Sequence, residues 1–78
     1  MRSNDLQHLY LGDILIYLPS LETGNIREYH ITNITEYFYR CDTIFDGKII
    51  NWTAMPKDKL ENYMLLKEAK QKMPQYFI

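Results

Sequence analysis

The side chains in this chain that could carry out chemistry are few, and their spacing does not suit catalysis. The two histidines, His8 and His30, have no carboxylate or cysteine at the spacing of a metal site. Cys41 is the only cysteine, and no serine stands in the setting of an activated nucleophile. The three glycines lie too far apart to form a phosphate-binding loop. We therefore expect no enzymatic activity, no metal and no cofactor.

Length and composition predict one small folded domain over residues 1–78. The chain is 46% apolar and carries a net charge of -1, which excludes the disordered class. The longest unbroken apolar run, residues 14–18, is too short to span a bilayer. No stretch near the N-terminus has the length of a signal peptide. A lone cysteine also suits a reducing compartment, so we expect a cytoplasmic protein without membrane contact.

Residues 9–54 have the composition of strands and turns. A short β-rich run at 14–18 is followed by a predicted hairpin loop at 19–25. The apolar alternation switches within 26–34, which predicts a bulge or a strongly bent strand. The segments 36–45 and 48–54 flank Asp46-Gly47, a pair that favours a two-residue hairpin turn. This part is predicted to form a small antiparallel curled sheet or partly open barrel of four to five strands.

A two-residue turn at Asp46-Gly47 fixes an expected register for the last hairpin. It places Ile44 opposite Ile49 and Cys41 opposite Trp52. Alternation then assigns one face to the core, with Cys41 as a buried structural thiol. The residues expected on that core face are Tyr39, Cys41, Thr43, Phe45, Ile50, Trp52 and Ala54.

The opposite face of this hairpin could present an aromatic and basic patch. Phe38, Arg40 and Ile44 share that face by alternation. We expect it to be covered, because the helix and the curled sheet together would close over both faces of a small barrel.

The C-terminal segment predicts one helix over residues 56–73, followed by an apolar tail at 74–78. Pro56 suits a first helical position, and Pro74 ends the helix. Residues 57–72 contain no glycine, proline or β-branched side chain. The predicted fold class is therefore α+β, mainly β, with a C-terminal α-helix.

Apolar side chains cover more than half the circumference of the predicted helix, which is more than packing on a small sheet requires. If no partner is involved, either Leu65 is simply exposed or the tail folds back over the second apolar stripe. Alternatively, another chain covers this stripe, and the helix then contacts a protein partner or its own copy in a homodimer. The candidate partner-binding residues are Leu65, Leu66, Ala69, Met73, Tyr76 and Phe77.

Charge divides unevenly along the chain and leaves a nucleic-acid alternative open. Residues 1–56 hold four basic against seven acidic side chains, and residues 57–78 hold five lysines against three acids. Lysines on one helix face would contact phosphates, although a dedicated duplex binder is usually basic over a whole face. The candidate nucleic-acid residues are Lys57, Lys59, Lys67, Lys70 and Lys72.

The opening segment Leu9-Tyr10-Leu11-Gly12-Asp13-Ile14-Leu15-Ile16-Tyr17 resembles the first strand of Src-homology-3-like small barrels, including Tudor-like and KOW-like modules. That resemblance covers residues 9–54 and implies a long loop at 19–25 and a bent second strand at 26–34. A small barrel with an appended helix also looks like accessory proteins of bacteriophages and mobile elements, including anti-CRISPR-type inhibitors. The resemblance implies an inhibitor that binds a larger host defence complex.

Seven tyrosines in 78 residues are more than a core of this size can bury. Tyrosine is enriched at binding surfaces because its ring is apolar and its hydroxyl stays hydrated. The leading expectation is therefore a non-enzymatic protein-binding module. The alternative is a nucleic-acid-binding accessory protein that uses the lysine-rich helix.

Overall fold

The computed structural model describes residues 9–77, so His8 and Ile78 lie outside the described residues. Its strands and helices follow one another along the chain as β1 (Ile14–Tyr17), α1 (Pro19–Thr23), β2 (Arg27–Ile34), β3 (Phe38–Phe45), β4 (Lys48–Pro56), β5 (Tyr63–Leu65), α2 (Leu66–Lys72) and a 3-10 turn, η2 (Pro74–Tyr76). The strands form one antiparallel sheet in the order β4-β3-β2-β1-β5, which does not close into a barrel. The expected mainly β fold with a C-terminal helix is confirmed.

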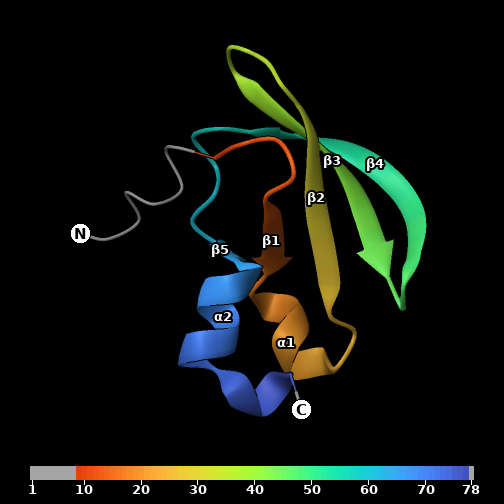
Figure 1. Cartoon of the computed structure of the whole chain (residues 1–78), viewed down its shortest axis with the longest axis vertical. Coiled ribbons are helices and arrows are strands. Elements are labelled where there is room, and N and C mark those ends of the chain that lie inside the picture. Colours follow the sequence, from red (N-terminus) through yellow and green to blue (C-terminus); the bar gives the residue numbers. More distant parts are fainter. Residues whose placement is uncertain (1–8, 78) are drawn as a thin grey trace.

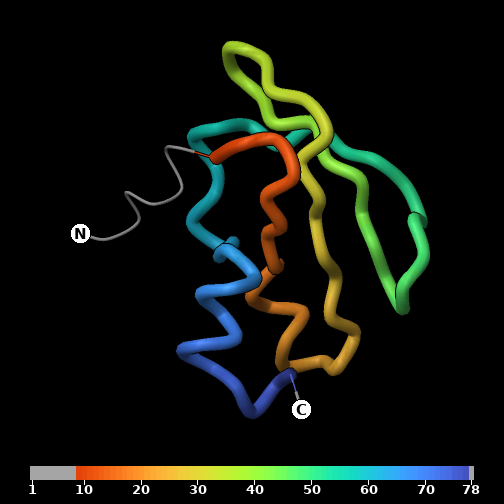
Figure 2. Tube along the Cα trace, in the orientation of Figure 1, coloured from red at the N-terminus to blue at the C-terminus, as the bar shows by residue number. Residues whose placement is uncertain are grey.

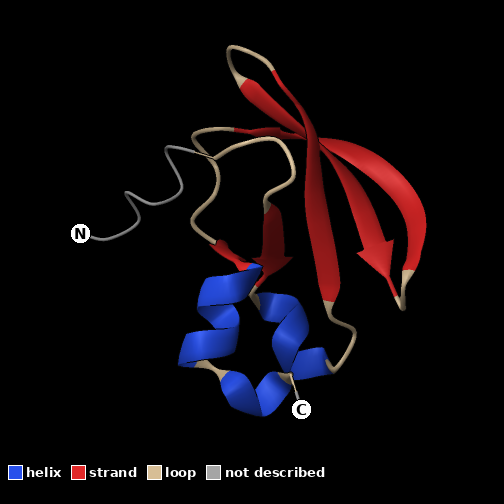
Figure 3. Ribbon diagram, viewed as in Figure 1, coloured by secondary structure: helices blue, strands red, loops and turns tan. Residues whose placement is uncertain are grey.

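The sheet has a long-stranded half and a short-stranded half. Figure 1 shows β2, β3 and β4 as long curved strands, with α1 and α2 grouped at the end of the short strands β1 and β5. The same separation of helices from the long strands is visible in Figure 3. In the trace of Figure 2, the β2–β3 connection projects beyond the rest of the sheet. One half of the sheet is therefore associated with helices, while the other ends at the open strand β4.

The turn between β3 and β4 forms as the sequence predicts. Asp46 and Gly47 have φ angles of 54° and 76°, the positive values that a two-residue hairpin turn of this kind requires. Phe45 pairs with Lys48, and Ile44 with Ile49. The turn therefore sets the first two pairs of the hairpin as expected.

Beyond those two pairs, the predicted register of the hairpin is wrong by one residue. A bulge shifts the register so that Thr43 pairs with Asn51 rather than with Ile50. Since the side-chain period of a strand is two, a slip of one residue moves the rest of β4 to the opposite face. Trp52, expected in the core, is 57% exposed, and Met55 lies in the core instead.

The second strand also contains the irregularity that its apolar pattern predicts. The register between β2 and β3 shifts between Ile31 and Asn33, which confirms the expected bulge or bend in residues 26–34. The preceding segment, expected as a plain loop at 19–25, instead forms α1. Pro19 occupies an early position of this short helix, and Gly24 ends it with a left-handed φ of 80°.

The predicted helix over residues 56–73 is wrong in its first half. Strand β4 continues to Pro56, and α2 begins only at Leu66. Residues 63–65 pair with the free edge of β1 as β5. There the Tyr63 ring lies 5.2 Å from Tyr17 and 5.5 Å from Tyr29. Helix propensities differ by less than about 1 kcal/mol per residue, so strand pairing and ring contacts outweigh them.

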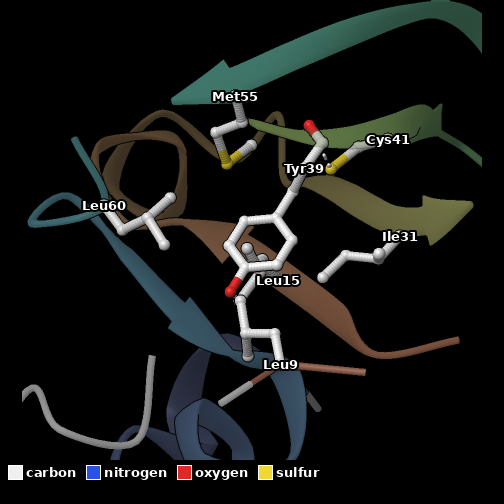
Figure 4. Packing of buried hydrophobic residues seen from close by; sticks show 7 residues of the cluster. All are labelled: Leu9, Leu15, Ile31, Tyr39, Cys41, Met55 and Leu60. Atoms are coloured by element: carbon white, nitrogen blue, oxygen red, sulfur yellow. Dashed lines mark hydrogen bonds between the residues drawn. The ribbon is translucent and has the colours of Figure 1, made fainter. Parts of the chain in front are cut away.

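The core lies against the face of the sheet that we call the inner face. Its buried cluster consists of Leu9, Leu15, Ile31, Tyr39, Cys41, Met55 and Leu60. Figure 4 shows the Tyr39 ring at the centre of this cluster, between Leu60 and Ile31. Strand β1 is buried on both faces, because Ile16 is as fully buried as its neighbour Leu15. Strand β1 is therefore the element around which the sheet and the helices pack.

Candidate functional site

The described residues do not bring a set of metal-binding side chains together. Among residues 9–77, no cluster of three or more histidine, cysteine, aspartate or glutamate side chains could hold a metal ion. His30 Nε2 lies 2.9 Å from Glu28 Oε1 in a half-exposed pair, and Cys41 is fully buried. In the same part of the chain, no helix is long and apolar enough to cross a membrane.

Burial shifts two titratable groups on the core side of the sheet. The pKa of the Cys41 thiol rises from 9.0 to about 11 because the group is buried, and the nearby Asp42 charge adds to the rise. The pKa of the Tyr63 hydroxyl rises from 10.0 to about 12, again chiefly through burial, with smaller contributions from Tyr29, Tyr17 and Cys41. Both groups are therefore neutral in the folded protein at physiological pH.

These shifts predict that the protein loses stability in alkali. A thiol with a folded pKa above its unfolded value contributes stability that is complete below about pH 9 and is lost as the pH rises to about 11. For Cys41 the loss is about 2–3 kcal/mol of unfolding free energy, and Tyr63 adds to it between about pH 10 and 12. Urea denaturation from neutral to alkaline pH measures the effect. A midpoint that stays constant up to pH 11 would contradict it.

The candidate partner-binding residues at the C-terminus are used largely within the fold. Ala69 is fully buried, so the expectation that it meets a partner is wrong. Leu65 lies in β5 rather than on a helix, where it pairs with Leu15 and packs against the core cluster. Leu66, Met73 and Phe77 are partly buried, and Tyr76 is exposed; a partner role for these four stays a prediction.

The sequence predicts that the candidate lysines share one helix face, but in the structure they do not. Lys57 and Lys59 precede β5, and the Lys57 ammonium lies 5.2 Å from the centre of the Tyr39 ring. The other three are on α2: Lys67 and Lys70 border a shallow hollow of about 260 Å³, and Lys72 pairs with Glu68 at 3.1 Å. The nucleic-acid alternative stays a prediction.

Several exposed apolar side chains lie on the outer face of β3 and β4, the side opposite the core. The pairs Phe38–Pro56, Arg40–Ala54, Asp42–Trp52 and Ile44–Ile49 form successive rows across the two strands. Because alternate residues share a face, these rows form one continuous surface. We call its main side chains the outer patch: Phe38, Arg40, Ile44, Ile49, Trp52 and Ala54.

The outer patch has the residue types of a binding surface. The Arg40 guanidinium carbon lies 4.2 Å from the centre of the Trp52 ring, within the range of a cation–π contact. Ile49 is 64% exposed, and Phe38 and Ile50 are exposed as well. The same face turns polar over β2, where the side chains of Glu28 and His30 contact each other. Apolar exposure is therefore concentrated towards the open edge of the sheet.

A hollow of about 350 Å³ adjoins the Phe38 end of the outer patch. It is lined by Glu36, Tyr37, Phe38, Pro56, Lys57 and Asp58. Two hydrogen bonds hold its wall in place. The Phe38 amide donates to Thr35 Oγ1 at 3.0 Å in the turn between β2 and β3, and the Lys57 amide, just after β4, donates to the Tyr37 carbonyl at 2.9 Å. The hollow is thus a formed concavity with aromatic walls and two carboxylates.

The sequence identified part of this surface. It placed Phe38, Arg40 and Ile44 on one face, but the expectation that this face is covered is wrong for Phe38 and Arg40, which are exposed. Trp52 was missed because it was assigned to the core. The signal that could have placed it is Met55, a further apolar residue with the spacing to face Tyr39 once one residue of β4 is left unpaired.

Comparison with known proteins gives no relative: no protein-family model, no curated protein and no solved structure matches this chain.

Proposed function

We propose that this chain is a non-enzymatic protein-binding module that docks through the outer patch. The observation that carries the proposal is the exposure of Trp52 beside Arg40 within a continuous apolar row. Tryptophan and arginine are the residue types most enriched at the energetic centres of protein interfaces. A contiguous apolar surface on a small domain marks an interaction site more often than chance.

The shape of the surface favours a protein over a small molecule. The hollows described above hold about 260–350 Å³, near the lower end of the range for small-ligand sites. The outer patch is instead a broad sheet face. Phe38, Ile49, Ile50 and Trp52 are each between 43% and 64% exposed. A partner with an apolar contact surface would remove these side chains from water.

The hollow beside Phe38 gives the interface a specific feature. Its aromatic and proline walls suit an apolar stem, and the carboxylates of Glu36 and Asp58 suit a cationic head. The Lys57 ammonium that borders the same hollow lies over the Tyr39 ring. We therefore expect the partner to insert an arginine or lysine side chain beside its apolar contact.

The narrower proposal names the partner as a host defence complex that this chain inhibits, as the resemblance to phage and mobile-element accessory proteins implies. A cytoplasmic setting agrees with it, because Cys41 is a free thiol and reducing compartments keep thiols free.

The outer patch is tested by substitutions at its exposed positions. Ile49→Asp and Trp52→Ala are expected to lower capture of the partner from host lysate roughly 30-fold, because each removes a central apolar contact. Leu11→Asp is the matched control, since Leu11 is an aliphatic side chain with the same 64% exposure as Ile49 but lies in the turn before β1. Quantitative mass spectrometry of the captured proteins gives the measurement and identifies the partner.

A second readout uses the single tryptophan of the chain. Once the partner is purified, its binding should shift Trp52 fluorescence to shorter wavelength, because the ring leaves water. Equal capture by the wild-type chain and both outer-patch variants would contradict the proposal. Equal loss with Leu11→Asp would contradict it as well.

A further inference from the structure

Strand β4 is an open edge of the sheet over nine residues. It is the last strand in the order β4-β3-β2-β1-β5, and among residues 9–77 only β3 pairs with it. The opposite edge, β5, has three residues and leads directly into α2. An exposed edge strand presents unpaired N–H and C=O groups to which another strand can add.

The hydrogen-bonding pattern identifies which groups of β4 face this edge. The Lys57 amide donates to the Tyr37 carbonyl of the neighbouring hairpin arm at 2.9 Å. In an antiparallel pair, alternate residues point their backbone groups to the same side. Met55 and Thr53 therefore direct theirs to β3, and Ala54 and Trp52 direct theirs outward. The two residues together offer two N–H donors and two C=O acceptors.

The centre of this edge lacks the features that usually block strand addition. Proteins protect open edges with lysine, proline or bulges. In β4 these features lie towards its ends: Lys48 begins the strand, the bulge follows it, and Pro56 ends the strand. From residue 51 to residue 55 the strand carries no charge and no proline.

We propose that two copies of this chain pair through β4, antiparallel, about a two-fold axis at Thr53. In this register, the outward groups of Trp52 bond to those of Ala54 in the second copy, and the reverse pair completes four hydrogen bonds. Trp52 then lies beside a small alanine rather than beside a second large ring. The two Thr53 side chains meet across the axis, a favourable pair between strands.

Charge does not oppose a second copy at this edge. The residues that pair about the axis, Trp52, Thr53 and Ala54, are uncharged, so no like charges meet where the two copies join. The net charge of -1 offers little repulsion between copies.

The pairing would also enlarge the docking surface. Only this consequence of the pairing rests on the proposed function. A two-fold axis perpendicular to the sheet keeps both outer patches on the same side. The combined surface is twice that of one patch and so comes closer to the roughly 800 Å² that each side of a standard protein interface buries.

The edge is tested by removing one donor and keeping the side chain small. Ala54→Pro deletes the outward N–H while leaving the inward bonds of β4 in place, because proline is tolerated at the edge of a sheet. Ala54→Ser is the matched control, since it keeps the N–H. Sedimentation should show the wild-type chain and Ala54→Ser reaching twice the 9.4 kDa mass of one chain, with the dissociation constant of Ala54→Pro raised roughly 10- to 100-fold.

A measurement without substitution covers the case in which Ala54→Pro fails to fold. Amide hydrogen exchange of the wild-type chain should show Trp52 and Ala54 becoming protected as concentration rises and the dimer forms. A monomer up to about 500 µM would overturn the pairing, as would equal dissociation constants for folded Ala54→Pro and Ala54→Ser. Unprotected Trp52 and Ala54 amides in a dimer would also overturn it. A monomeric chain whose partner capture still depends on Ile49 and Trp52 would leave the docking role intact and remove only the dimer.

Discussion

Replacing Leu15 with alanine is expected to remove about 3 kcal/mol from the free energy of unfolding. Leu15 is fully buried in the core cluster. Its strand is central, and Leu15 pairs with Tyr29 on one side and with Leu65 on the other. The cavity therefore lies on the inner face above a central strand, and pairing on both sides keeps the backbone of β1 from moving to fill it.

This loss is large for a chain of 78 residues, whose total stability is expected to be about 4–12 kcal/mol. Urea denaturation followed by far-ultraviolet circular dichroism measures it. Leu11→Ala is the control, because it removes the same atoms from an exposed side chain and should change stability by less than about 0.5 kcal/mol. A loss of under about 1 kcal/mol for Leu15→Ala would show that β1 is not the centre of the core.

The thiol of Cys41 is expected to react with a disulfide reagent at least about 100-fold more slowly in the folded chain than in the unfolded one, at about pH 8. The thiolate is the reactive form, and a rise of the pKa from 9.0 to about 11 lowers its population by that factor. The side chain is also fully buried, so the reagent reaches it only when the core opens.

Because Cys41 is the only cysteine, the release of the reporter group measures this single site. The same protein in concentrated urea provides the reference rate. The rate should rise with urea and should fall to near zero when Cys41 is replaced by alanine. A folded protein that reacts at the rate of the unfolded chain would show that Cys41 is accessible, and it would contradict the inner face as described.

Local signals in the sequence were sufficient to predict the structure wherever particular residue types dictate the backbone conformation. Asp46-Gly47 fixed the turn and its first two pairs, since few residues adopt two successive positive φ angles. The switch in apolar alternation located the irregularity in β2. The mainly β architecture with a C-terminal helix followed from the change in apolar period along the chain.

The composition of the outer patch depends on one unpaired residue of β4, which local sequence patterns do not reveal. Ile44 and Ile49 lie opposite each other as predicted, but the unpaired residue of β4 then reverses the faces. Because of this reversal, Trp52 lies on the exposed outer face and Met55 lies in the core. Both arrangements bury apolar side chains against Cys41 and Tyr39, so alternation alone does not choose between them.

By itself, the amino-acid sequence determined the turns, the approximate strands and the presence of a final helix, because these depend on backbone preferences within a few residues. The tertiary structure alone decided where that helix begins and which side of β4 faces water. Met64 and Leu65 are good helix residues that become part of a strand, with Tyr63, because β1 has a free edge beside them. The exposure of Trp52 likewise follows from packing across strands, where contacts between distant residues outweigh local preference.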